Sequence, residues 1–214
     1  MIKELTEKNL KQLVKQATEI LQDGGAVIFP TDTLYGLGVD ALNSEAIEYF
    51  FTLKKRPTDK PIPVFVSGIE EARQTAFIDE RQENIIKKLW PGPFTVVLNK
   101  KEIFSERLSA GTDTIGLRSP DSKFCRRLLG EFGGPITASS ANISGMEPSL
   151  DINKIIEQFE EHSDIPELVI DAGILEPSEP STVIDIREEK PKILRLNNST
   201  KEKLKEVFGD KISW

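Results

Sequence analysis

The order of apolar segments along the chain places the strongest constraint on its fold. Apolar residues recur at helical spacing over 10–21, which predicts an amphipathic helix, and two glycines follow it as a stop signal. A short apolar run at 26–29 then predicts a buried strand. Helices and strands alternate in this way early in the chain, whereas several strands follow one another in its middle. This order predicts an α/β fold with helices on the faces of a mixed sheet.

The other elements are predicted from the same periodicities. Further helices are expected from Asn43 or Ser44 to 53, within 70–89 as one helix or two, and at 122–129, 153–160 and 200–207. Further strands are expected at 62–66, 95–99, 114–118, 135–139, 168–171, 181–186 and 192–196. The N-terminal residues are expected to lead directly into the first helix. We therefore predict one domain over 1–214, with a core over about 13–196 and a closing C-terminal helix at 200–208.

Composition narrows the classes of function. The 214 residues are 38% hydrophobic and 29% charged, as in an ordinary globular protein with one substantial core. The apolar runs are too short to span a bilayer, and no signal peptide is recognised, so a cytoplasmic location is expected. The net charge of −7 argues against a broad basic surface for nucleic acid. Any anion site must then be a local basic pocket.

The single histidine and the single cysteine limit the chemistry further. A metal site built from histidine and cysteine is excluded by this count. His162 lies in a polar stretch and is expected to be a solvated surface residue. Cys125 lies in a short apolar helical pattern and is expected to be a buried structural thiol rather than a nucleophile.

A basic turn is the first candidate for a binding site. Lys54, Lys55, Arg56 and Lys60 fall within seven residues, with Pro57 among them and Pro61 directly after them. Arginine offers a planar fork to a phosphate, and lysine offers a mobile point charge. A solvated helix end, where cations are favoured by the helix dipole, is the alternative.

Two further segments carry small polar side chains. The polar, glycine-containing loop 31–38 follows a buried strand, where ligands collect in α/β sheets, but it matches neither a Rossmann fingerprint nor a P-loop. It is equally explained as a structural turn. The run 137–145 delivers hydroxyl and amide side chains that suit a phosphate or ribose, with a turn and helix cap as the alternative. We expect 31–60 and 139–142 to form one site for nucleotide phosphates.

Three strand ends supply additional candidates. Arg118 and Arg195 each end an apolar strand, where a ligand contact and a structural salt bridge are equally good explanations. Ser181 begins a strand and is either a ligand contact or only part of a sheet edge.

These pieces, in this order, resemble the YrdC-like family of threonylcarbamoyl-AMP synthases. The matching segments are 30–38, 54–57 with 60–61, 90–93, 116–118, 140–145 and 181–185. The resemblance covers about 13–196 and implies a fold around a large concave cavity. It corresponds to the single-domain form, since longer relatives carry a second C-terminal domain.

The resemblance implies a nucleotidyltransferase reaction. Threonine and bicarbonate form N-carboxy-threonine, which attacks the α-phosphorus of ATP and releases pyrophosphate. The product, threonylcarbamoyl-AMP, passes to a transferase complex that modifies tRNA beside the anticodon. Carbamate attack needs no enzyme nucleophile, which agrees with the shortage of histidine and cysteine. Such phosphoryl chemistry depends on positioning and charge neutralisation.

The resemblance also implies roles for particular residues. ATP is expected to face Lys54, Arg56, Lys60, Thr114, Ser140, Asn142, Ser149 and Arg195, of which Lys54, Arg56, Ser140 and Asn142 form the catalytic group. Threonine is expected to face Thr33, Phe65, Arg118, Ala138 and Ser181, with Arg118 on its carboxylate and Ala138 acting through its backbone. Phe65 stands where some relatives have histidine. Mg²⁺ is expected with the triphosphate, at a position that the sequence does not indicate.

Two other functions compete with this one. A double-stranded RNA or tRNA binding module would use the same basic turn, although the overall acidity opposes it. A carbamoyl-transfer domain of the hydrogenase-maturation type occurs in much longer chains with zinc-finger-like regions, and this chain has only one cysteine.

Overall fold

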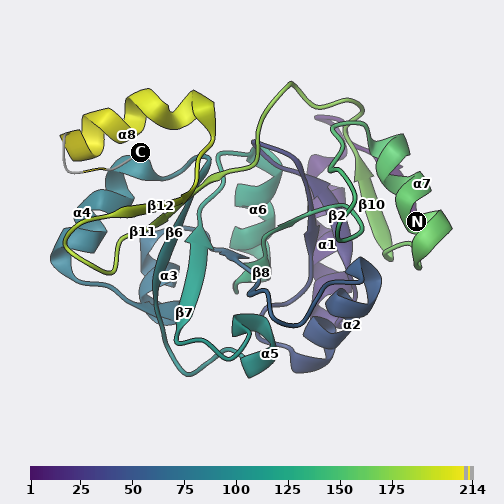
Figure 1. Ribbon diagram of the computed structural model, residues 1–214. Helices are drawn as coiled ribbons and strands as arrows, with labels where there is room; N and C mark the ends of the chain where they lie inside the picture. Colours follow the sequence, from purple (N-terminus) through teal and green to yellow (C-terminus); the bar gives the residue numbers. More distant parts are fainter. Residues whose placement is uncertain (210–211, 213–214) are drawn as a thin grey trace.

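The strands form two sheets that lie side by side (Figure 1). The computed structural model describes residues 1–209 and 212. The first sheet has the order β1 (Ile2–Glu4), β10 (Leu168–Asp171), β2 (Val27–Pro30), β3 (Tyr35–Gly38) and β9 (Ser139–Ser140). The second has the order β12 (Lys192–Arg195), β11 (Thr182–Asp185), β6 (Phe94–Lys100), β7 (Thr114–Arg118), β4 (Val64–Phe65) and β8 (Ile136–Thr137), with β5 (Ala76–Phe77) paired to β6.

Both sheets mix parallel and antiparallel pairs. Strands β1, β10 and β2 are parallel, and β3 pairs antiparallel to β2 and β9. In the second sheet β6 is parallel to β11 and antiparallel to β7. The predicted α/β class and mixed pairing are therefore confirmed, but the strands are divided between two sheets rather than gathered in one.

The division occurs in a short segment that was expected to be one strand. Instead of a strand at 135–139, β8 pairs with β4 of the second sheet and β9 pairs with β3 of the first. Ala138 lies between them, and its backbone N–H donates to Pro63 O at 2.7 Å. Ile136 and Thr137 are buried, whereas the two serines of β9 are only half-buried. The crossing therefore places the serines at the seam between the sheets.

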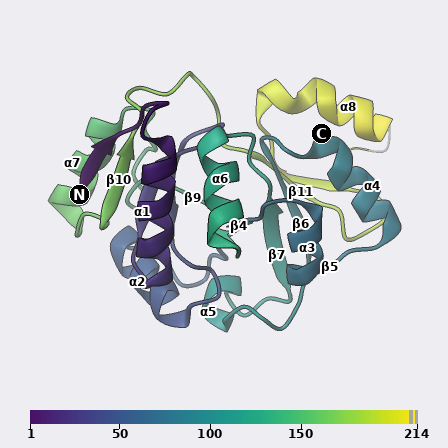
Figure 2. The ribbon, with the colours of Figure 1, turned by 180° about the vertical axis from the view of Figure 1, so that it is seen from behind.

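Helices cover the outer faces of both sheets. Figure 2, which is seen from behind, shows α1 (Leu10–Gln22) and α6 (Lys123–Phe132) running side by side in front of the sheets. Helices α2 (Ser44–Lys54) and α7 (Ile152–His162) lie beside the first sheet, and α4 (Glu80–Leu89) and α8 (Lys201–Phe208) beside the second. The shorter helices are α3 (Ile69–Thr75), α5 (Glu106–Ser109) and the 3₁₀ turn Asn198–Thr200. In the described residues no helix combines the length and apolarity needed to cross a membrane.

Strand β3 departs from the predicted loop at 31–38. Its four residues are fully buried, and only the part before Tyr35 is a loop. A Cβ atom on Gly38 would lie 2.6 Å from Phe29 Cε1 and 2.7 Å from Ile136 Cγ2. Glycine is thus required here for close packing between strands, not for a flexible turn.

The N-terminus also differs from the prediction. Residues of β1 pair in parallel with β10 before the first helix begins, although the chain was expected to enter that helix directly. All three β1 residues are exposed, so no burial pattern marks the strand in the sequence. The segment 70–89 contains two helices separated by β5, which is one of the two arrangements expected.

The expectations for cysteine and histidine are confirmed. Cys125 is buried in α6, its Sγ donates to Pro30 O, and burial raises the pKa of the thiol to about 12. His162 ends α7 with its side chain 39% exposed.

Candidate functional site

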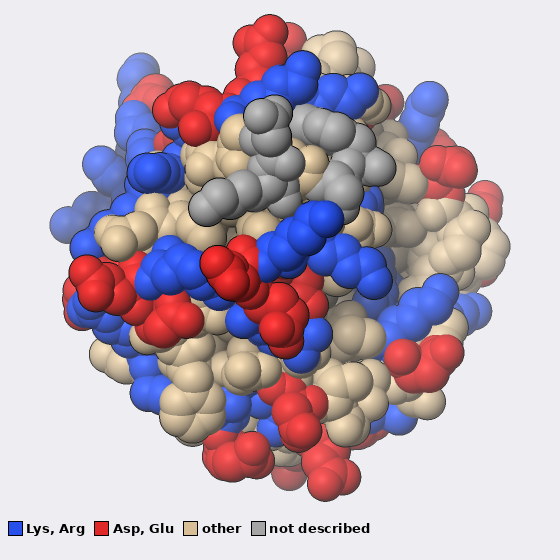
Figure 3. Space-filling view, turned by 60° about the vertical axis from the view of Figure 1, so that its left-hand side comes forward, with Lys and Arg blue, Asp and Glu red and all other residues tan. Residues whose placement is uncertain are grey.

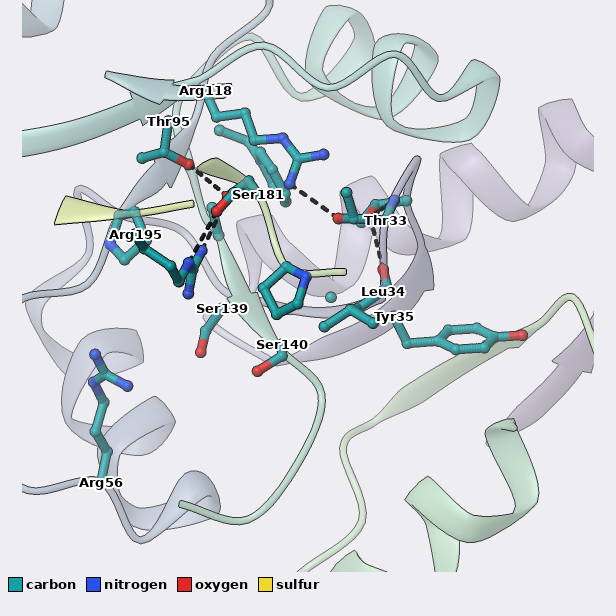
Figure 4. A pocket seen from close by; sticks show the side chains of 16 residues that line it. Thr33, Leu34, Tyr35, Arg56, Thr95, Arg118, Ser139, Ser140, Ser181 and Arg195 are labelled. Carbon is teal, nitrogen blue, oxygen red and sulfur yellow. Dashed lines mark hydrogen bonds between the residues drawn. The ribbon is translucent and has the colours of Figure 1, made fainter. Parts of the chain in front are cut away.

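Two adjoining cavities lie at the seam between the sheets and share Arg56 and Ser140. The seam cavity, of about 180 Å³, is lined by residues from both sheets (Figure 4). They are Thr31, Thr33, Leu34, Tyr35, Gly36, Arg56, Pro63, Phe65, Thr95, Arg118, Ala138, Ser139, Ser140, Pro180, Ser181 and Arg195. The turn cavity, of about 280 Å³, is lined by Lys54, Lys55, Arg56, Pro57, Lys60, Ser140, Asn142, Ser144 and Gly145.

Lys54 supports the loop that separates the two cavities. It is the last residue of α2 and is only 2% exposed. Its ammonium Nζ donates to Ser140 O at 2.6 Å, to Asn142 O at 2.7 Å and to Asn142 Oδ1 at 2.9 Å. Burial, reinforced by the nearby Arg56, lowers the pKa of Lys54 to about 7. Because its three donors already have acceptors, Lys54 acts on the shape of this loop.

Asn142 completes the same network. Its amide nitrogen donates to Ile143 O at 2.9 Å and to Met146 O at 2.7 Å, which fixes Oδ1 toward Lys54. Ser140 Oγ donates to that Oδ1 at 2.6 Å. The loop is thus held by side chains as well as by the pairing of β9 with β3, and Ser140 keeps its oxygen at the junction of both cavities.

The basic turn is folded back on itself. Lys55 adopts a left-handed backbone conformation after α2. Arg56 donates from Nε to Lys60 O at 3.3 Å and from Nη2 to Pro61 O at 2.9 Å. Burial lowers the pKa of the Arg56 guanidinium. Within the described residues neither Arg56 nor Lys60 forms an ion pair. Their positive charges are therefore available to an anion.

Arg118 is held on three sides in the seam cavity. It ends β7, is 4% exposed, and forms an ion pair with Asp32. Its Nε donates to Gly92 O at 3.1 Å, and its Nη1 donates to Thr33 Oγ1 at 3.0 Å. The ring of Phe65 lies under the guanidinium, 5.6 Å from its carbon to the ring centroid. A guanidinium has five N–H donors, so two remain for a ligand.

Arg195 occupies the opposite strand edge. It ends β12, and its Nε donates to Ser181 O at 2.9 Å while its Nη2 donates to Ser181 Oγ at 3.1 Å. Burial and the charge of Arg118 both lower the pKa of Arg195. Figure 4 shows Ser181 joined to both Arg195 and Thr95, and Arg118 joined to Thr33, in the lining of the same cavity. Ser181 thus links β11 with both neighbouring strands.

Most residues predicted for the site line one of the two cavities. Those in the seam cavity are Thr33, Phe65, Arg118, Ala138, Ser181 and Arg195; those in the turn cavity are Lys54, Lys60 and Asn142; Arg56 and Ser140 line both. Thr114 and Ser149 line neither cavity. Thr114 Oγ1 lies 3.1 Å from Thr112 Oγ1, and Ser149 Oγ accepts from Asp151 N at 3.0 Å.

Two contributors to the site were missed in the sequence. Asp32 is the ion-pair partner of Arg118, and Thr95 binds Ser181 in the cavity wall. Asp32 lies inside the predicted loop between two threonines, so its carboxylate could have been recognised as a partner for a basic residue of the site. Thr95 has no such signal, because it lies within an apolar strand and its polar partner is distant in the sequence.

The sequence profile of the Sua5/YciO/YrdC family, described as "Telomere recombination", matches residues 19–197. The chain belongs to this family. A threonylcarbamoyl-AMP synthase of Pyrococcus abyssi is 35% identical over 92% of the chain, and one of Bacillus subtilis is 32% identical over 92%. The chain spans 57% and 56% of the lengths of these two relatives.

Solved structures of the family share the fold. P. abyssi Sua5 in complex with L-threonine matches with a TM-score of 0.90 at 33% identity, over 98% of this chain and 61% of that one. E. coli YciO matches with a TM-score of 0.78 at 26% identity, over 92% of this chain and 94% of that one. The two-sheet α/β architecture is thus that of the family.

The surface does not present one continuous basic face in the view of Figure 3. Lys and Arg side chains alternate there with Asp and Glu side chains. This distribution agrees with the net charge of −7. A surface that tracks a nucleic-acid backbone requires clustered positive charge, so this face offers little support for an RNA-binding module.

Proposed function

We propose that this chain synthesises threonylcarbamoyl-AMP from L-threonine, bicarbonate and ATP, with release of pyrophosphate, as a nucleotidyltransferase. The observation that carries the proposal is the pair of adjoining cavities that share Arg56 and Ser140. The turn cavity contains two cations that lack ion-pair partners among residues 1–209 and 212, Arg56 and Lys60, which suit a triphosphate. The seam cavity contains the firmly held guanidinium of Arg118, which suits a carboxylate. The names of the relatives, and the L-threonine complex of one of them, support the same assignment.

The reaction divides between the two cavities. Threonine and bicarbonate form N-carboxy-threonine with loss of water, and a carbamate oxygen then attacks the α-phosphorus of ATP. The bond from this phosphorus to the bridging oxygen breaks, and pyrophosphate leaves. In the proposal Arg118 binds the threonine carboxylate through its two free N–H groups, while Thr33, Phe65, Ala138 and Ser181 form the rest of the amino-acid site.

Phosphate binding is assigned to the turn cavity and to the part of the seam cavity that Arg195 lines. Arg56, Lys60 and Arg195 neutralise the charge that develops as pyrophosphate leaves, and Ser140 lies between the two substrates. Lys54 and Asn142 maintain the loop that carries Ser140. Thr114 and Ser149 remain candidates for contacts with parts of ATP that extend beyond the two cavities.

Mg²⁺ fits this site only as a companion of the nucleotide. In the described part of the chain no three His, Cys, Asp or Glu side chains come together as a metal site. Mg²⁺ commonly binds through substrate phosphates and water with few protein ligands. When bound, the ion would reduce the negative charge of the triphosphate, and we assign no residue to it.

The cellular context is part of the proposal. The product is an activated carbamoyl group, which a separate transferase complex would transfer to tRNA beside the anticodon. We place this activity in the cytoplasm and in one domain spanning 1–214. Direct contact with tRNA is not required for synthesis of the small-molecule product.

Product analysis tests the proposal. Pyrophosphate release is expected only when ATP, L-threonine and bicarbonate are all present, and Arg56→Ala and Ser140→Ala should abolish it while the fold is retained. Arg126→Ala is the matched control, because Arg126 forms an exposed ion pair with Asp121 and lines neither cavity. Release of ADP, release without threonine, or wild-type rates in the Arg56 and Ser140 variants would contradict the assignment.

A further inference from the structure

Thr95 and Ser181 form a buried pair of hydroxyl groups in the wall of the seam cavity (Figure 4). Thr95 lies in β6, and Ser181 directly precedes the neighbouring strand β11; their exposed fractions are only 4% and 5%. Their oxygen atoms, Oγ1 and Oγ, lie 2.9 Å apart, which is a hydrogen bond. Neither the sequence motifs nor the proposed reaction gives Thr95 a role.

The pair has one more hydroxyl proton than it can use in hydrogen bonds within the described residues. Two hydroxyl groups carry two protons, and the bond between them uses one. Arg195 Nη2 donates to Ser181 Oγ at 3.1 Å, so Ser181 is the acceptor in that bond and keeps its own proton. In the described residues the second hydroxyl proton has no acceptor. A buried O–H group without an acceptor is unfavourable, so the pair is suited to a ligand that supplies one.

Arg195 also fixes the direction of this spare donor. Its Nε donates to Ser181 O at 2.9 Å, so one guanidinium holds both the backbone and the side chain of Ser181. If Thr95 also donates to Ser181 Oγ, both acceptor positions of that oxygen are filled. The Ser181 hydroxyl proton is then the donor of the pair that has no acceptor among the described residues.

We propose that Thr95 is a positioning residue that donates to Ser181 and thereby presents the Ser181 hydroxyl proton to an oxygen of the amino-acid substrate. The ligand chemistry is an oxyanion, namely a carboxylate or the carbamate formed from the amine. This inference rests on the proposed function. It adds a residue to the amino-acid site and a reason for the orientation of Ser181.

Titration calorimetry with L-threonine tests the proposal directly. Thr95→Val keeps the shape of the side chain and removes its hydroxyl, so the Kd for threonine should rise about tenfold, as for the loss of one hydrogen bond. Thr95→Ser restores the hydroxyl, and its Kd should stay within about twofold of the wild-type value.

Thr182 provides a matched control in the next position of the chain. Its Oγ1 lies 2.6 Å from Thr200 Oγ1, so it also belongs to a buried hydroxyl pair, but it lines neither cavity. Thr182→Val should lower the melting temperature without changing the Kd for threonine. An equal rise in Kd for Thr182→Val would show a general structural effect and overturn the proposal.

Steady-state kinetics separates positioning from loss of fold. Thr95→Val should raise KM for threonine about tenfold and leave KM for ATP within about twofold. If Thr95→Val binds threonine like the wild type, or Thr95→Ser is as impaired as Thr95→Val, the inference is wrong while the proposed function stands. If the wild type itself neither binds threonine nor releases pyrophosphate, both fail together.

Discussion

Replacement of Lys54 by methionine should disturb the loop that carries Ser140 and Asn142 much more than it lowers the stability of the whole fold. Methionine fills a similar volume but cannot donate to Ser140 O, Asn142 O or Asn142 Oδ1. Lys54 is 2% exposed, so water cannot readily replace it. The substitution therefore removes three hydrogen bonds from one loop and leaves the sheets and the other helices unchanged.

The contacts of Lys54 set the size of the effect. Its three hydrogen bonds are those of the ammonium form, and because burial lowers its pKa to about 7 we assign each bond only the ordinary value of about 0.5–1.5 kcal/mol. Three such bonds amount to about 2–4 kcal/mol of unfolding free energy. For a chain of this size that corresponds to a fall in melting temperature of roughly 5–15 °C.

Activity should fall much further than stability. Ser140 and Asn142 lose the support that fixes them at the junction of the cavities, and a displacement of about 1 Å in such a site reduces rates about 100-fold. We expect kcat/KM for ATP to drop by about this factor in a pyrophosphate-release assay at 25 °C. The Kd for L-threonine should change little, because Arg118 and Thr33 do not contact Lys54.

The pH dependence provides an independent check. The folded pKa of Lys54 lies below its usual value of 10.5, so between about pH 7 and 10.5 the unfolded chain binds the extra proton. This group's contribution to stability is thus present above pH 10.5 and is lost as the pH falls through about 7. Urea titrations at pH 7 and 9 should show this slope in the wild type and not in Lys54→Met. Wild-type kcat/KM in the variant, or equal slopes in both proteins, would refute the reasoning.

Two other perturbations have specific expected outcomes. Asp32→Asn leaves the buried Arg118 without its counter-charge, so urea denaturation should show a loss of about 3 kcal/mol. L-Threonine should restore more stability to this variant than to the wild type, and an equal loss in the exposed Asp121→Asn would contradict the explanation. Cys125 should resist a thiol reagent at pH 8 until urea unfolds the chain, because burial raises its pKa to about 12. The stability contributed by this thiol is fully present below about pH 9 and is lost as the pH rises from there through about 12. Rapid labelling of the native protein would contradict this explanation, because it would show that the thiol is accessible.

Local signals in the sequence predicted the elements well. Asn43 was one of two expected caps of α2, and its side chain accepts from Glu45 N and Ala46 N. The basic turn was predicted from its charges and prolines, and the structure shows Arg56 folded back onto the carbonyl groups of the same turn. Such features depend on residues close in the sequence, which is why they are readable from it.

Features that depend on distant partners were not predictable in the same way. Gly36 and Gly38 suggested a loop, and only the approach of Phe29 and Ile136 shows that they belong to a packed strand. The seam between the sheets forms because β8 pairs with β4 and β9 pairs with β3, although β8 and β9 come from one short run of the sequence. No periodicity in that run indicates the change.

The candidate site shows the same limit. Arg118 and Ser181 were recognised individually, but their partners Asp32 and Thr95 are each 86 residues away. The sequence left open whether Arg118 was a salt-bridge residue or a ligand contact. In the structure it forms the salt bridge and still lines the seam cavity, so the two explanations do not exclude each other.

The arginines of the site are of two kinds, those with a carboxylate partner among the described residues and those without one. Arg118 is paired with Asp32, so its charge is largely compensated and its main contribution is a fixed direction for two N–H groups. Arg56 and Arg195 are partly buried, their pKa values are lowered by burial, and neither has a carboxylate partner in the described residues. An anion that binds them relieves this unfavourable burial, so they contribute affinity. A substrate with one carboxylate and a co-substrate with several phosphates require this division, because the first must be oriented for attack while the second must have its charge neutralised.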